Sequence, residues 1–121
     1  MKRLIITILT MLVLCFAETS AQNIAYVRQI NGYYHLYDSR GRDIRQISID
    51  KTTLIGYSEK LIIVQKNGYY IIYNSSGKKL STLDADMIGK ITNVLTDGFI
   101  SERKGFTYRW NSNGTERTII K

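Results

Sequence analysis

Few residues of this chain carry side chains that could bind a metal or act as a nucleophile. The 121 residues include one histidine, His35, and one cysteine, Cys15. A protein zinc site draws several ligands, chiefly from cysteine and histidine, and this sequence does not supply such a set. Cys15 also lies in an apolar N-terminal stretch that we expect to be removed. We therefore predict no metal site and no cofactor.

Carboxylates are more numerous, but their positions indicate turns rather than catalysis. Asp84 and Asp86 are spaced like part of a calcium-binding loop, yet the further oxygen ligands and the closing glutamate of that loop are missing. Asp38, Asp43 and Asp50 fall at turns and strand ends, where aspartate is common. The sequence therefore indicates a protein that is not an enzyme.

The elements that would position these side chains come in three similar copies. Residues 31–44, 67–80 and 104–117 each start beside a glycine, continue through aromatic residues and reach a second glycine. The first glycines of the copies are 36 and 37 residues apart, at Gly32, Gly68 and Gly105. Repetition at this period is typical of an array of like units. We predict one domain over residues 22–121, with units at about 23–50, 51–86 and 87–121.

Each copy has the signals of an antiparallel meander. Asn31-Gly32 and Asn67-Gly68 separate β-forming runs, and Asn-Gly favours a two-residue hairpin turn. A second turn is indicated at Asp38–Gly41 and its counterparts. We expect strands at residues 23–30, 33–37 and 43–49, then 61–65, 69–73 and 79–83, then 99–102, 106–110 and 116–120. Residues 52–58 and 90–96 could add a fourth strand to the second and third units, whereas the first would keep three.

The repeated pattern resembles a blade of a β-propeller and is similar to the WG-type repeats of secreted bacterial proteins. The matching residues are Gly32, Tyr33, Tyr37, Asp38, Gly41 and Arg42, then Gly68, Tyr69, Tyr73, Asn74, Gly77 and Lys78, then Gly105, Phe106, Trp110, Asn111 and Gly114. The resemblance implies propeller-like blades. Because propellers have roughly four to eight blades, three would form an open arc or half of a ring shared by two chains.

Alternation along the strands suggests which side chains form the core. Alternate residues of a strand share a face, and one face of the central strand is apolar or aromatic in all three units. We expect this face to be core, including Tyr33, Tyr37, Tyr69 and Tyr73. The opposite face is apolar in the first two units and polar in the third. We therefore expect units one and two to be covered on both faces, and unit three to end the stack.

The N-terminus indicates export. A basic start at Lys2 and Arg3 precedes an apolar run over residues 4–17, and small residues lead to a plausible cleavage point after Ala21. This is the layout of a secretory signal peptide, predicted at residues 1–21. The run of about 14 residues is shorter than the roughly 20 that span a bilayer. We predict a secreted or periplasmic bacterial protein, with membrane attachment only if the segment is retained.

The charge of the chain favours acidic partners. The formal net charge is +7, and it falls to +6 for residues 22–121 because Lys2, Arg3 and Glu18 are removed. A basic balance of this kind attracts anionic molecules, while export argues against a role with nucleic acid.

The sequence thus predicts a non-catalytic binding or assembly module that recognises protein or glycan through aromatic and basic surface. The candidate ligand-binding residues are Tyr34, Tyr57 and Tyr70. The three-stranded first unit would leave an open edge, and the candidates for self-association there, giving a homodimer, are Ile24, Tyr26 and Val27. Two alternatives stay open: a structural subunit that closes a β-propeller ring by self-association, and an enzyme whose site forms between chains.

Overall fold

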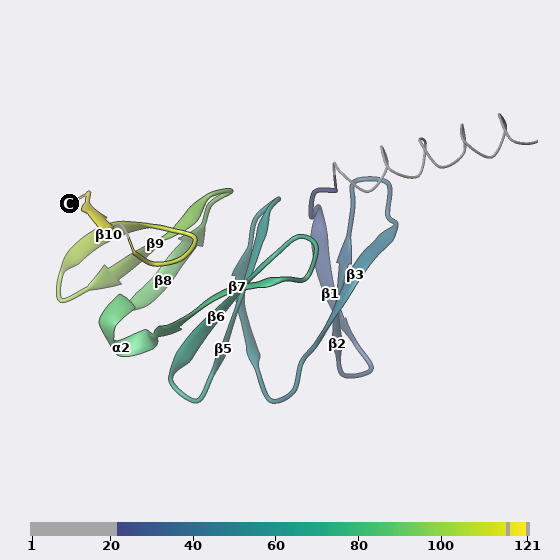
Figure 1. Cartoon of the computed structure of the whole chain (residues 1–121), viewed down its shortest axis with the longest axis horizontal. Helices are drawn as coiled ribbons and strands as arrows, with labels where there is room; N and C mark the ends of the chain where they lie inside the picture. The colour runs from purple at the N-terminus through teal and green to yellow at the C-terminus, as the bar shows by residue number, and fades with distance from the viewer. Residues whose placement is uncertain (1–21, 116, 121) are drawn as a thin grey trace, which may run out of the picture.

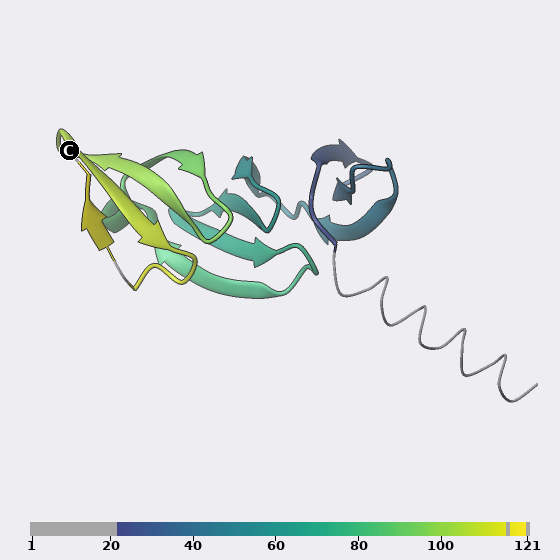
Figure 2. The same cartoon turned by 90° about the horizontal axis from the view of Figure 1, so that it is seen from above.

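The computed structural model describes residues 22–115 and 117–120 and shows an all-β protein, as expected. Three antiparallel sheets lie side by side in sequence order, with the first and third at opposite ends of the row (Figure 1 and Figure 2). The predicted signal peptide lies outside the described residues. Within the described part, no helix has the length and apolar character needed to cross a membrane.

The sheets contain three, four and four strands, as the sequence predicts. Sheet 1 consists of β1 (Tyr26–Ile30), β2 (Tyr33–Tyr37) and β3 (Asp43–Ser48). Sheet 2 consists of β4 (Thr53–Tyr57), β5 (Leu61–Lys66), β6 (Tyr69–Asn74) and β7 (Lys79–Asp84). Sheet 3 consists of β8 (Lys90–Val94), β9 (Gly98–Arg103), β10 (Phe106–Asn111) and β11 (Arg117–Ile119). The short helix α2 (Ala85–Ile88) connects β7 to β8.

The tight turn in each unit sets the register of its central hairpin. The φ angles are 51° and 82° at Asn31-Gly32, 53° and 82° at Asn67-Gly68, and 52° and 83° at Lys104-Gly105. Two successive positive φ values are the signature of a type I′ turn, which matches the twist of the flanking strands. The three hairpins that these turns close, β1–β2, β5–β6 and β9–β10, pair without any register shift.

The second turn is held by an Asp or Asn side chain that bonds the backbone ahead of it. One carboxylate oxygen of Asp38 accepts the backbone N–H groups of Arg40 and Arg42, each at 2.9 Å. Asn74 accepts two backbone N–H groups at the matching positions, both at 3.0 Å, and Asn111 accepts one at 3.1 Å. The side chain thereby replaces bonds that the backbone cannot make within the turn.

The sheets pack face to face, and sheet 2 is the middle layer. We call the side of each sheet that includes Tyr33, Tyr69 or Phe106 its front face, and the other side its back face. The first core joins the back of sheet 1 to the front of sheet 2 and contains Ile24, Tyr34, Leu36, Ile47, Ile62 and Val64. The second core joins the back of sheet 2 to the front of sheet 3 and contains Leu61, Ile63, Tyr70, Ile72, Ile88, Ile91, Phe99 and Trp110.

The expectation that Tyr33 and Tyr69 belong to the core is wrong. Their exposed fractions are 47% and 48%, and the equivalent Phe106 is 51% exposed. All three directly follow the tight turn, and Tyr33 lies in addition on the front of sheet 1, which no described sheet covers. Tyr37 and Tyr73, farther along the strand, are half-buried.

The expectation that both faces of unit one are covered is also wrong. Sheet 2 is buried on both sides and sheet 3 ends the row, as predicted, but sheet 1 ends the row as well. Its back face packs against sheet 2, and no sheet within residues 22–115 and 117–120 covers its front face. An apolar pattern on both sides of a strand indicates a middle layer, and here it occurs in an outer one.

The turn at Asp38 gives a test by pH. Hydrogen bonds from the backbone of Arg42, then from its side chain and the backbone of Arg40, hold the pKa of Asp38 below its ordinary value of 3.8. Because the pKa of Asp38 is lower in the folded than in the unfolded state, its ionised carboxylate stabilises the fold at any pH above the unfolded-state pKa. This stabilisation is lost as the pH falls through the folded-state pKa. Asp38→Asn keeps an acceptor for the turn, as Asn74 does, but cannot titrate.

We expect the free energy of unfolding of Asp38→Asn to fall less steeply than that of the wild type as the pH drops below about 3.8. Urea unfolding across a pH series measures both slopes. Asp38→Ala serves as the control, because it removes the acceptor and should be less stable than Asp38→Asn throughout. Parallel curves for the wild type and Asp38→Asn would contradict the assignment.

Candidate functional site

Two of the three tyrosines predicted to bind ligand are core residues, so this part of the prediction is wrong. Tyr34 is 0% exposed and Tyr70 is 6% exposed. Their hydroxyls are satisfied internally: that of Tyr34 lies 2.9 Å from Thr52 Oγ1, and that of Tyr70 donates to the Gly89 carbonyl at 2.7 Å. Tyr57 is displayed, with 39% of its surface exposed.

The front of sheet 1, which no other described sheet covers, carries exposed aromatic residues, and we call it the end face. It is formed by Tyr26, Arg28, Ile30, Tyr33, His35 and Tyr37, which pair across β1 and β2. The equivalent face of sheet 2 is covered by sheet 1, and that of sheet 3 is covered by sheet 2. The end face is therefore the one front face without a neighbouring sheet in the described part of the chain.

Contacts within the end face hold its rings in fixed positions. The rings of Tyr26 and Tyr37 are stacked, with centroids 4.8 Å apart and planes 14° from parallel. The rings of His35 and Tyr37 are also close to parallel, with centroids 6.3 Å apart and planes 19° from parallel. Because neighbouring rings restrain one another, this surface presents flat aromatic area at little cost in side-chain entropy.

Polar groups accompany these rings. His35 Nδ1 lies 2.6 Å from Asp43 Oδ2, and the amide of Gln46 donates to the same oxygen at 3.3 Å. A histidine oriented by a carboxylate is one part of many catalytic sites. Among the described residues, however, no hydroxyl or thiol is hydrogen bonded to the imidazole, and no group of three or more His, Cys, Asp and Glu side chains could hold a metal ion. The arrangement is suited to binding through stacking and hydrogen bonds.

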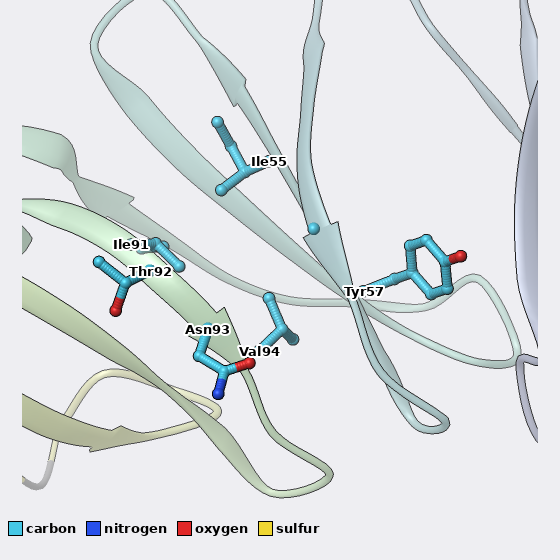
Figure 3. Close-up of a pocket in the computed structure, with 7 residues that line it drawn as sticks. Ile55, Tyr57, Ile91, Thr92, Asn93 and Val94 are labelled. Carbon is cyan, nitrogen blue, oxygen red and sulfur yellow. The ribbon is translucent and has the colours of Figure 1, made fainter.

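A pocket lies between sheets 2 and 3, where β4 and β8 approach each other (Figure 3). Both strands change register at this level, between Leu54 and Gly56 and between Ile91 and Asn93. The pocket has a volume of about 170 Å³, smaller than the roughly 300–1,000 Å³ of most ligand pockets. Its lining offers no carboxylate, imidazole or amine: it consists of Ile55, Gly56, Tyr57, Ile91, Thr92, Asn93 and Val94.

The three residues predicted for the open edge are divided between core and surface. Ile24 is 2% exposed and belongs to the first core, and its N–H donates to the Glu59 carbonyl at 2.7 Å. Including it in an exposed edge was therefore wrong, because the chain before β1 leans onto sheet 2. Tyr26, at 39% exposed, and the half-buried Val27 do lie on β1, the outermost strand of sheet 1.

The pattern of the strands does not predict the end face, although a comparison of the repeats indicates that this face is exposed. Arg28 occupies the slot held by Val64 in the second unit, and His35 occupies the slot of Ile71. Polar residues in two slots that are apolar in the middle unit indicate that the first unit faces solvent on that side.

The fold and the candidate site define the class of protein: a row of three small antiparallel sheets, with an aromatic and basic surface on the front of sheet 1. Comparison with family models, curated proteins and solved structures found no match to this chain.

Adjacent tyrosines of β2 give a matched test of the face assignment. Tyr34→Ala is expected to lower the free energy of unfolding by about 3–5 kcal/mol, because it opens a cavity in the first core. Tyr33→Ala removes an exposed ring and should change that free energy by about 0.5 kcal/mol or less. Chemical denaturation of the two variants measures the difference, and losses of similar size would contradict the assignment.

Proposed function

We propose that this chain is a non-catalytic binding module of an exported bacterial protein, and that the end face of sheet 1 binds a protein partner. The observation that supports the proposal is the position of this face. Front faces with the same repeat pattern are covered by a neighbouring sheet in the other two units. A solvated surface of this composition is typical of interaction sites.

The composition of the end face suits a protein interface. Tyrosine and arginine are the residues that most often dominate binding energy, and the end face combines exposed Tyr26 and Tyr33 with exposed Arg28. The basic balance of the chain would favour partners with acidic surface. Export is proposed from the N-terminal sequence alone.

A glycan is a second candidate partner. Stacked Tyr26 and Tyr37 offer flat ring surface, and the His35–Asp43 pair offers hydrogen-bonding groups beside it. These are contacts that a sugar ring can use, with its apolar face on the aromatic surface and its hydroxyls on polar groups.

Self-association into a closed β-propeller ring is the alternative function. The regular stacking of the sheets and the three-stranded sheet 1 favour it. Ring closure would place the back of sheet 3 against the end face of another copy. That back face includes Glu102 and Arg109, both exposed, with Arg109 paired to Asp97 at 2.9 Å. Burying these charges against tyrosine rings would be costly, so we rank self-association second.

A photo-cross-linking residue placed at position 33 in cells that produce the full chain tests the proposal. We expect an adduct of discrete mass with a protein of another sequence. Position 69 is the control, because Tyr69 occupies the same repeat slot and is equally exposed, at 48% against 47%, but lies outside the end face.

Other outcomes of this experiment are informative. An adduct between two copies, together with a dimer mass in light scattering, would support the ring instead. Glycan-array binding that Tyr33→Ala abolishes and Tyr69→Ala does not would make the partner a sugar. Equal labelling at both positions with no glycan bound would overturn the proposal.

A further inference from the structure

The outer edge of β1 differs from the other sheet edges of the described chain. The edge strands β3, β4, β7 and β8 each contain a register shift in their pairing, and β11 has only three residues. Bulges and shortness are the usual devices that prevent an edge from accepting another strand. β1 instead pairs over five residues without a shift, as the interior strands β5 and β9 do with their hairpin partners. β1 therefore has the regularity of an interior strand.

The repeats show what occupies this edge elsewhere. In sheet 2, β4 pairs with the outer side of β5, and in sheet 3, β8 pairs with the outer side of β9. β4 and β8 pair with their neighbours in the same register relative to the hairpin turn, and the register shift falls at the same position in both pairs. No described strand takes this position beside β1.

The backbone of β1 offers hydrogen bonds toward this vacant position. The two residues that flank a two-residue turn, here Ile30 and Tyr33, form a hydrogen-bonded pair. Pairs farther along the hairpin alternate between non-hydrogen-bonded and hydrogen-bonded ones. Val27 and Gln29 therefore direct their N–H and C=O groups away from β2. Their counterparts in sheet 2, Ile63 and Gln65, are the residues paired with Gly56 and Thr53 of β4.

The vacant position also has a floor, provided by sheet 2. Leu54 and Val27 pack against the same core. Tyr57 holds the position in sheet 2 that Val94 holds in sheet 3. The side chain of Val94 is covered closely by β4: a Cβ added to Gly56 would lie 3.0 Å from Val94 Cγ2. Tyr57 has no such cover and is 39% exposed, and its ring points away from β8, toward the side of sheet 1 (Figure 3). Tyr57 therefore lies beneath the place where a fourth strand of sheet 1 would run.

We propose that β1 accepts an extended segment of another protein as the fourth strand of sheet 1. The segment pairs with Val27 and Gln29 in the register of β4 and β8, and it lies over Leu54 and Tyr57. Strand addition of this kind gains affinity from main-chain hydrogen bonds and specificity from alternate side chains. The proposal concerns the edge of sheet 1, and it stands whether or not the end face binds a partner.

The surroundings define the chemistry of the segment. The residue of the segment at the position of Ile55 faces Leu54 of sheet 2 and is aliphatic. The residue at the position of Gly56 lies beside Tyr57 and is small, because Tyr57 is larger than Val94, the side chain that Gly56 itself contacts. The residue opposite Arg28 lies on the solvent side and is acidic, because Arg28 is exposed and forms no ion pair with any described carboxylate. Opposite charges across a strand pair add stability.

The partner is a single strand and not the β1 edge of a second copy. β4 extends sheet 2 by one strand beyond the edge of β1, and Leu54 of this strand reaches the first core. A second copy approaching edge to edge would bring its own sheet 2 into the space that β4 occupies. An extended peptide avoids this collision because it has no sheet packed behind it.

A capped synthetic peptide with the sequence of residues 52–58, carrying glutamate at the Leu54 position, is the probe. It is titrated at millimolar concentration into the isotope-labelled full chain and followed by NMR. We expect the amide signals of Val27 and Gln29 to shift and their hydrogen exchange to slow by about tenfold or more. A peptide with lysine at the Leu54 position should bind about threefold more weakly, because it faces Arg28.

The matched variants are Gln29→Pro and Gln29→Ala. Proline removes the outward N–H and is tolerated on the open side of an edge strand, so Gln29→Pro should weaken peptide binding about tenfold. Alanine keeps the N–H, so Gln29→Ala should bind as the wild type does. Should Gln29→Pro fail to fold, a peptide N-methylated at the Thr53 position removes the hydrogen bond that this position donates to the Gln29 carbonyl.

Several results would overturn the proposal. These are unchanged Val27 and Gln29 signals with the glutamate peptide, full binding by Gln29→Pro, and full binding of the N-methylated peptide. Tyr33→Ala lies on the end face away from the edge and should leave peptide affinity unchanged. Loss of binding in Tyr33→Ala with retention in Gln29→Pro would place the peptide on the end face, which would support the proposed function and refute strand addition.

Discussion

Each sheet of this protein depends on its neighbours to bury its apolar faces. A sheet of three or four strands has two faces and no layer of its own to cover them, so it is stable only when another sheet packs against it. Sheet 2 satisfies this requirement on both sides, through Ile62 and Val64 on its front and Ile63 and Ile72 on its back. The two outer sheets each lean on it with one face.

The position of a unit in the row explains how the three copies differ. Slots that hold Val64 and Ile71 in the middle unit hold Arg28 and His35 in the first, because the front of sheet 1 has no described neighbour. At the other end, the back of sheet 3 carries exposed Arg109. The third unit has become polar on its open face, whereas the first keeps tyrosine rings among the polar groups.

Sheet 1 is thus incomplete in two physically different ways. In the part of the chain that the structure describes, its front face lacks a covering layer, and its outer edge lacks the strand that both other sheets have. The face offers side chains, led by the stacked Tyr26 and Tyr37, and the edge offers backbone groups at Val27 and Gln29. Because β1 takes part in both, a partner that adds a strand would also extend the aromatic surface beside it. The other edge strands are bulged or short, so the acceptor properties concentrate at one end of the molecule.

The sequence by itself determined the strands, the turns and the number of strands in each sheet. Asn31-Gly32 and Asp38 impose their turns through local backbone and side-chain geometry, which needs no distant partner. Only the tertiary structure decided which face of each strand is buried. Tyr33 and Tyr34 are both aromatic, so alternation cannot rank them, and the overlap with sheet 2 buries Tyr34 while leaving Tyr33 exposed. The candidate site depends on the same packing, which is why Tyr34 and Tyr70 were assigned wrongly and the end face was not anticipated.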